Sequence, residues 1–366
     1  MNSAHRALLL AASLVLSILL LALLIRASHL DLRAMLQQLG DVRWPAALRL
    51  LLLNILLILV STEKWRRIDD AWRSPSDAVQ PRSTSFALTS LGFGLGVFLP
   101  VQIAMSAART LGTFMSGSAI KRGTAGTLYE QSFDLGTVGL FAIASAIAHY
   151  TTRGIAASTI YVWTITAATL LLLALGLAGS LARLIRLSAQ AVARALQRPE
   201  PWTGWCPRFV TFFLANQGPM RQPTTISPRL REKLRQLSDS PVLSPHLARQ
   251  LILLSAARFF IVVLMSVTTA TAIGLQIPFA HMTMAIPFVV MASVIALTPG
   301  GLGINELAGS GALTLFGTPF ALAARWSIAN RLLITASYLS IAIVTVVFLS
   351  VAKLAASTGS APCEDH

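Results

Sequence analysis

Long apolar stretches, separated by short polar segments, make up most of the chain. A helix needs roughly 20 apolar residues to cross the hydrocarbon core of a bilayer. Stretches of that kind predict about six full transmembrane helices, at residues 7–25, 46–62, 133–150, 155–180, 249–275 and 328–351. The first stretch is longer than the apolar core of a usual signal peptide, and no clear A-x-A cleavage site follows it. We therefore interpret it as a retained transmembrane helix. The pattern predicts an all-α, polytopic membrane protein.

Two further apolar stretches, at residues 86–120 and 279–316, are interrupted in the middle by helix-breaking residues. The first contains Gly92, Gly94, Gly96 and Pro100, and the second contains Pro299, Gly300, Gly301 and Gly303. Lipid cannot hydrogen-bond the backbone that such breaks expose, so the breaks must be enclosed by protein or line a wet cavity. We predict two re-entrant, broken-helix hairpins in an inverted-repeat-like arrangement, although close helix packing would also explain the glycines alone.

The composition agrees with a membrane protein. Of the 366 residues, 55% are hydrophobic and 12% charged, and the mean hydropathy is +0.69. Two cysteines, Cys206 and Cys363, are too few for a disulfide framework and have no metal-ligand spacing. We predict no metal and no cofactor. In a membrane protein the net charge of +15 indicates loops that meet anionic headgroups rather than a nucleic acid.

The distribution of Lys and Arg predicts the orientation, because these residues accumulate on the cytoplasmic side of a membrane. If both broken stretches return to the side from which they start, the termini and residues 63–85, 121–127 and 181–248 share one side. That side then holds 20 of the 29 Lys and Arg residues, against seven on the other. We therefore predict a protein of the bacterial inner membrane with both termini in the cytoplasm.

The chain is predicted to form a single transmembrane domain over residues 1–356, with a short disordered tail at 357–366. Within the basic loop 181–248, four arginines spaced as on a helix suggest an amphipathic interfacial helix: Arg183, Arg186, Arg194 and Arg198. Trp202 and Trp205 would anchor the following segment at the interface. A solvated connector without specific binding explains this loop equally well.

Three carboxylates fall at predicted membrane depth or its edge, where a charge is costly and a functional role is expected. Glu130 and Asp134 are four residues apart, so on a helix they share one face and require a nearby cation. Arg109 and Arg258 are the candidates. Alternatively, Thr127 and Glu130 could form a capping box at the start of a helix.

The third carboxylate, Glu306, follows the glycines of the second broken stretch. Asn305 could cap a helix that begins at Glu306, with the glycines forming the turn. The backbone amides of Gly300, Gly301 and Gly303 could also form an anion site beside a positive helix end, suited to a phosphate. Arg325 and Arg331 are possible partners of Glu306 or of that phosphate.

Four short elements of the chain form a recognisable set. They are an LP segment followed by an arginine (Leu99, Pro100, Arg109), the acidic pair of YEQSFD (Glu130, Asp134), PGGLGINE with Glu306 at its end, and a later arginine (Arg331). This set resembles the transmembrane flippase-like domain of lysylphosphatidylglycerol synthases, over essentially the whole chain. The family also includes free-standing bacterial membrane proteins and archaeal proteins of lipid-linked glycosylation.

The chain departs from that family at several positions. The Gly-Glu that commonly precedes the first arginine is replaced by VQIAMSAA, and Gln131 and Asn305 stand where arginines are common. The resemblance then implies that the arginines still present in this chain would have to pair with a phosphate or a carboxylate. The bifunctional relatives carry a soluble aminoacyltransferase domain, and the chain ends at His366 without one, so lysyl transfer is not expected.

We therefore predict a flippase-like lipid translocase, not an enzyme, that moves an anionic or polyprenyl-linked headgroup across the membrane. The predicted headgroup-binding residues are Arg109, Arg258, Gly300, Gly301, Gly303, Glu306 and Arg331. The three carboxylates Glu130, Asp134 and Glu306 would hold the arginines or exchange protons. The expected partners are membrane lipids, and a homodimer is left open.

Two other functions remain open. A membrane glycosyltransferase, or a subunit of one, would need acidic residues at the membrane face, for which the candidates are Asp31, Asp41 and the pair Asp69 and Asp70. A scaffold without transport would tolerate neutralisation of all three membrane carboxylates.

Overall fold

A computed structural model describes residues 3–73, 79–115, 120–151, 156–177, 244–295 and 298–358. Every regular element in these segments is a helix, and none of them contains a strand. The predicted all-α class is confirmed. Four helical segments within them are long and apolar enough to cross a membrane: Trp44–Trp72, Gly126–Thr151, Pro245–Ala272 and Phe320–Phe348.

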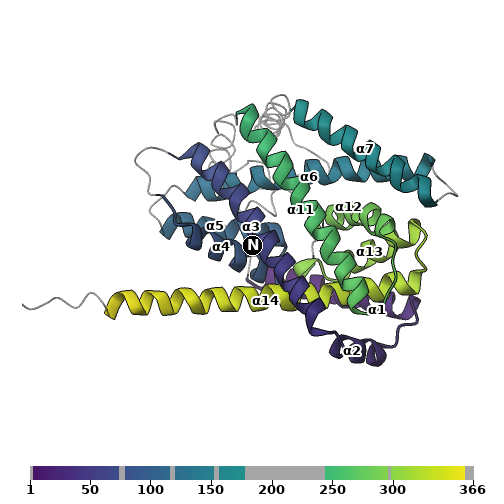
Figure 1. Ribbon diagram of the computed structural model, residues 1–366. Coiled ribbons are helices and arrows are strands. Elements are labelled where there is room, and N and C mark those ends of the chain that lie inside the picture. Colours follow the sequence, from purple (N-terminus) through teal and green to yellow (C-terminus); the bar gives the residue numbers. More distant parts are fainter. Residues whose placement is uncertain are drawn as a thin grey trace, which may run out of the picture.

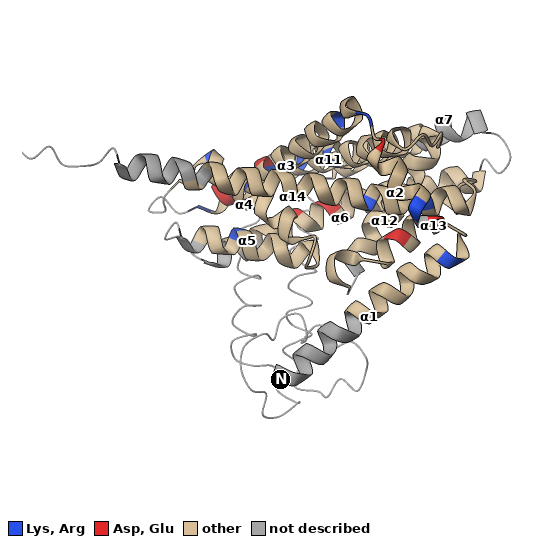
Figure 2. Cartoon of the chain, turned by 90° about the horizontal axis from the view of Figure 1, so that it is seen from below, with Lys and Arg blue, Asp and Glu red and all other residues tan. Residues whose placement is uncertain are grey.

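Each of the six predicted spans corresponds to a long helix. These are α1 (Ser3–Ala27), α3 (Trp44–Trp72), α6 (Ile120–Thr151), α7 (Ala156–Gly176), α11 (Pro245–Ala272) and α14 (Phe320–Thr358). A short helix, α2 (Leu32–Gly40), follows α1, and the carboxylate of Asp31 caps it by accepting from the Arg33 and Ala34 amides at 2.9 and 3.2 Å. Charged positions are sparse along these helices (Figure 2).

Several helices extend beyond the predicted spans. α3 continues to Trp72, past the predicted end of its span at 62, and α6 begins at Ile120, before the predicted start of its span at 133, so residues 121–127 are helical. In these added turns Lys64 and Glu130 are buried in ion pairs, which offset the cost of burying their charges. α11 begins at Pro245, so residues 245–248 do not belong to the basic loop.

Parts of two other predictions lie outside the described residues. The basic segment 181–243, with its proposed interfacial helix and Trp202 and Trp205, is one of them, and residues 359–366 of the predicted tail are the other. Ser244 forms the N-cap of α11 by accepting a hydrogen bond from the Leu247 amide at 3.2 Å.

Both broken stretches fold as pairs of short helices that pack on each other. The first pair is α4 (Arg82–Leu95) and α5 (Val101–Met115), and the second is α12 (Phe279–Ile295) and α13 (Ile304–Leu315), joined through the 3₁₀ turn η1 (Pro299–Gly301). Gly92 allows α4 to approach α5, because a Cβ there would lie 2.7 Å from the Met105 sulfur. The two helices of each pair, with the break between them, form what we call hairpin 1 (residues 82–115) and hairpin 2 (residues 279–315).

The segments α3–α6 and α11–α14 repeat the same pattern of contacts. α3 packs along α11 between the two hairpins, with hairpin 1 on one side and hairpin 2 on the other (Figure 1). In each segment the second hairpin helix packs on the long helix that follows it, α5 on α6 and α13 on α14. The first hairpin helix packs on the corresponding long helix of the other segment, α4 on α14 and α12 on α6. These two segments therefore form interlocked halves of the molecule.

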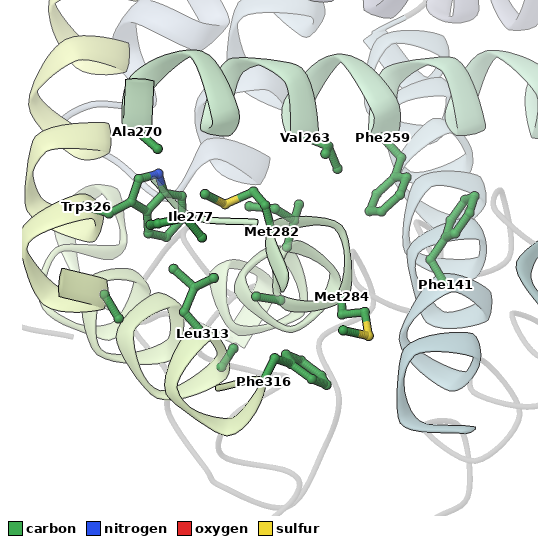
Figure 3. Packing of buried hydrophobic residues seen from close by; sticks show 14 of the residues in the cluster. Phe141, Phe259, Val263, Ala270, Ile277, Met282, Met284, Leu313, Phe316 and Trp326 are labelled. Carbon is green, nitrogen blue, oxygen red and sulfur yellow. The ribbon is translucent and has the colours of Figure 1, made fainter. Parts of the chain in front are cut away.

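The largest apolar cluster joins α6, α11 and hairpin 2. The rings of Phe141 and Phe259 stack with centroids 4.2 Å apart, and Trp326 of α14 donates its indole N–H to the Ser266 carbonyl oxygen at 3.0 Å (Figure 3). Small residues such as Ala285 and Ala312 let the helices approach closely, as is typical of membrane interiors. This packing fixes the positions of the helices that carry the polar residues described next.

Candidate functional site

A group of buried charges lies where α3, α5, α6 and α11 meet. Arg109 of α5 has no exposed surface and is ion-paired with Glu130 of α6. The same guanidinium donates to the Ser61 carbonyl oxygen at 3.2 Å and lies 5.1 Å from the centroid of the Trp65 ring. The arginine is thus held by a carboxylate, a carbonyl and an aromatic face at once.

Asp134, one helical turn beyond Glu130, is bound by two cations. Lys64 of α3, which is fully buried, contacts one carboxylate oxygen, and Nη1 of Arg258 of α11 lies 2.6 Å from the other. Lys64 belongs to the first half and Arg258 to the second, so this carboxylate ties the halves together. Arg109 and Arg258 are the two cations that the sequence suggested for the acidic pair.

Sequence reasoning missed Lys64 because it ended the second span at residue 62 and placed residues 63–85 on the cytoplasmic side. The buried positions of α3 recur at helical spacing through Leu50, Leu57, Ser61 and Ile68, and Lys64 lies on the same stripe. Extending that period beyond residue 62 would have found it.

A second polar group lies at the tip of hairpin 2. Arg331 of α14 donates to the Gly300 carbonyl oxygen, and its Nε lies 3.7 Å from a carboxylate oxygen of Glu306. A Cβ at Gly300 would collide with the Val97 carbonyl oxygen, which lies in the break of hairpin 1. The tips of the two hairpins are therefore in contact, and Arg331 lies beside that contact.

Three buried oxygen atoms around this tip have no hydrogen-bond partner among the described residues. They are Thr298 Oγ1, Asn305 Oδ1 and Glu306 Oε1. Buried polar atoms in folded proteins are nearly always satisfied by protein, water or a ligand. The tip is therefore polar enough to hold water or a ligand group beside Arg331.

The backbone amides of the tip are largely used within the turn. The Gly301 and Leu302 amides donate to the Thr298 and Pro299 carbonyl oxygens at 2.9 and 3.1 Å, and the Gly303 amide donates to Glu306 Oε2 at 2.6 Å. The amides of Gly301 and Gly303 are thus engaged within the tip itself.

The capping alternatives also need correction. Glu130 lies in the interior of α6, well after its start at Ile120, and the Thr127 hydroxyl donates to the Gly123 carbonyl oxygen, so neither residue caps a helix. Near Glu306 a helix is capped as predicted, but by a different residue. The N-cap of α13 is Gly303 instead of Asn305, and the Glu306 side chain binds the cap amide.

Cations outnumber carboxylates across the two polar groups. The described ion pairs join Lys64, Arg109, Arg258 and Arg331 to Glu130, Asp134 and Glu306. This leaves one positive charge in excess in a low-dielectric region, where it favours an anion. Arg325 is not ion-paired with Glu306 in the described part of the chain.

The acidic residues that were candidates for a glycosyltransferase site do not belong to the two polar groups. Asp31 caps α2, Asp41 stands at the C-terminal end of that helix, and Asp70 is ion-paired with Arg73 at 2.9 Å. Asp69 also has an interaction partner. A search of the described residues finds no group of three His, Cys, Asp or Glu side chains that could hold a metal ion.

Comparison with protein families agrees with this architecture. Residues 10–352 match the family described as the lysylphosphatidylglycerol synthase TM region. The chain belongs to this family. A search of the curated proteins found no match to the sequence.

Membership of the lysylphosphatidylglycerol synthase TM region family confirms the resemblance inferred from the motifs. It identifies the chain as a multi-pass membrane protein of lipid metabolism or lipid translocation. Each motif that carried the resemblance supplies a member of the two polar groups: Arg109, Glu130, Asp134, Glu306 and Arg331.

Proposed function

We propose that the protein is a lipid translocase that moves an anionic phospholipid, or a polyprenyl-linked lipid, between the leaflets of the membrane. The observation that carries this proposal is the contact between the two hairpin tips beside Arg331. Broken helices that meet inside a membrane are typical of transporter binding sites, because their irregular backbone must line a cavity or be enclosed by protein.

The charges support an anionic headgroup. Among the described residues, Arg331 makes a long ion pair with Glu306, at 3.7 Å, and a hydrogen bond to a neutral carbonyl. A phosphate could replace Glu306 as the partner of Arg331 without leaving the carboxylate alone, because the Gly303 amide still donates to it. Arg109 and Arg258 would bind the headgroup through a similar exchange with Glu130 and Asp134.

The contacts between the interlocked halves suggest how the polar region would become accessible from one face of the membrane and then from the other. Asp134 holds Lys64 of its own half and Arg258 of the other. A headgroup phosphate that competes for either cation would loosen the connection between the halves. Rocking one half against the other would then open the polar region to one face at a time.

The proposal is tested by reconstituting the protein in liposomes that contain phosphatidylglycerol labelled on an acyl chain. Quenching from outside measures how much label moves between leaflets, and polyprenyl phosphate and phosphatidylcholine serve as second and neutral substrates. We expect movement of at least one anionic lipid above protein-free liposomes. Arg331→Gln should reduce it about tenfold or more, because a charge-assisted contact to phosphate contributes about 1.5–3 kcal/mol.

The control is Arg49→Gln, which removes an exposed arginine of α3 away from both polar groups. This variant should transport as the wild type does. The proposal is wrong if none of the anionic lipids moves faster than in protein-free liposomes, or if Arg331→Gln and Arg49→Gln behave alike.

A further inference from the structure

A pocket of about 310 Å³ lies between α3 and α4. Its lining residues are Leu59, Thr62, Glu63, Arg66, Arg82 and Phe86. None of them belongs to the two polar groups described above. Along α3, Lys64 is buried among those groups, whereas Glu63 and Arg66 line the pocket.

The two arginines give this pocket a net positive charge. The Glu63 carboxylate is held by Arg67, whose Nε lies 2.8 Å from it, while the Arg66 guanidinium is 3.9 Å away. Arg66 is therefore only weakly engaged. Arg82 is exposed and forms no ion pair with any residue that the structure describes. Two guanidinium groups thus stand beside the pocket, and most of their N–H donors have no partner among the residues that the structure describes.

The lining residues are also ordered by polarity along both helices. Six of the eight residues from Glu63 to Asp70 are charged, so the membrane boundary lies near this part of α3. Leu59 lies one turn before Glu63, and Phe86 lies one turn after Arg82 at the start of α4, so both apolar residues are on the membrane side. The lining therefore changes from charged to apolar along both helices.

We propose that this pocket binds the headgroup of an anionic phospholipid from the adjacent leaflet, with the phosphate between Arg66 and Arg82 and an acyl chain against Leu59 and Phe86. Guanidinium groups bind phosphate through paired hydrogen bonds, and an amphiphile matches the change from charged to apolar lining. The site does not depend on translocation. A protein that moved no lipid could still hold one here.

The direct test is a photoactivatable phosphatidylglycerol, with the reactive group on its acyl chain, added to the detergent-purified full-length protein. We expect label on peptides containing residues 59–66 or 82–86. Excess phosphatidylglycerol should compete for this labelling and phosphatidylcholine with the same chains should not. This measurement uses the unmodified sequence, so it does not depend on how any variant folds.

A matched pair of variants gives the second measurement. Arg66→Gln with Arg82→Gln should weaken labelling at these peptides about tenfold or more, since each basic residue near a membrane surface contributes about 1 kcal/mol. Arg49→Gln with Arg73→Gln removes the same charge from α3 and its C-terminal cap and should leave the labelling unchanged.

Two results would overturn the proposal. One is labelling at these peptides that phosphatidylcholine competes for as well as phosphatidylglycerol does, or that survives loss of Arg66 and Arg82. The other is equal competition by water-soluble glycerol 3-phosphate, which would indicate a site for a free phosphate instead of a lipid.

Discussion

At the scale of single residues, Arg109 and Glu130 form an ion pair inside the first polar group. Both side chains are almost fully buried. Removal of one partner leaves an uncompensated charge, which costs about 3–5 kcal/mol in protein interiors. We therefore expect Glu130→Gln and Arg109→Gln each to lower the midpoint of thermal unfolding in detergent strongly.

The same ion pair predicts a strong non-additive effect. Arg109→Met combined with Glu130→Leu should be less destabilised than either single neutral variant, since no buried charge then remains alone. Arg67→Gln is the control, because the partly exposed pair of Arg67 with Glu63 should contribute about 0–1 kcal/mol. Additive losses in the double variant would contradict the assignment of Arg109 and Glu130 as a coupled pair.

Gly300 provides a second prediction at this scale. Its φ is +57°, and a Cβ there would meet both the Val97 carbonyl oxygen and the Arg331 guanidinium. Gly300→Ala should destabilise the protein by about 1–3 kcal/mol from backbone strain alone and should separate the hairpin tips. Loss of lipid movement in the liposome assay would accompany that change.

Gly311 is the matched control for Gly300. It lies within α13 of the same hairpin, and a Cβ there would meet no atom within 4 Å. Gly311→Ala should be neutral or stabilising by up to about 1 kcal/mol, because alanine favours the helix. Equal effects of the two substitutions, measured by thermal unfolding, would show that the tip contact does not restrict Gly300.

At the scale of helices, apolar length predicted which segments would be helical but not where they end. The predicted spans stopped short of Lys64 and Glu130, since isolated charges are costly in lipid. Their partners lie 70 and 21 residues away in sequence, respectively, and only the folded arrangement brings each pair together. Local pattern therefore predicted the helices, whereas tertiary pairing determined how far they extend.

The contact between hairpin 1 and α14 can be tested by exchanging small residues. A Cβ at Gly94 of α4 would lie 2.7 Å from the Cβ of Ala342 of α14. Gly94→Ala should cost about 1–3 kcal/mol through overpacking. Ala342→Gly should recover much of that loss when combined with it, because it removes the opposing methyl group.

The control for the small-residue exchange is Gly139→Ala, since a Cβ there would meet no atom within 4 Å. Ala342→Gly should not improve this variant. The four combinations of residues at positions 94 and 342, compared by thermal unfolding, give the coupling directly. A coupling near zero would mean that α4 and α14 do not touch at these positions.

At the scale of the whole molecule, the sequence indicated two broken hairpins but not that their tips meet. Val97 and Gly300 are about 200 positions apart, and no local pattern links them. The second half also supplies Arg258 to a carboxylate of the first half. The motifs thus identified most of the polar residues, while their division into two groups depends on how the halves interlock.

The interlocked halves lead to a prediction about the membrane. If hairpin 1 and hairpin 2 start from opposite faces, the connections that precede them must lie on opposite sides. Val79 precedes hairpin 1 and is exposed, and Gln276 precedes hairpin 2 and is also exposed.

In a variant without Cys206 and Cys363, a membrane-impermeant maleimide added to intact cells should modify Gln276→Cys but not Val79→Cys. Permeabilisation should expose Val79→Cys. Modification of both positions in intact cells, or of neither, would place the hairpins on one face and remove the basis for alternating access.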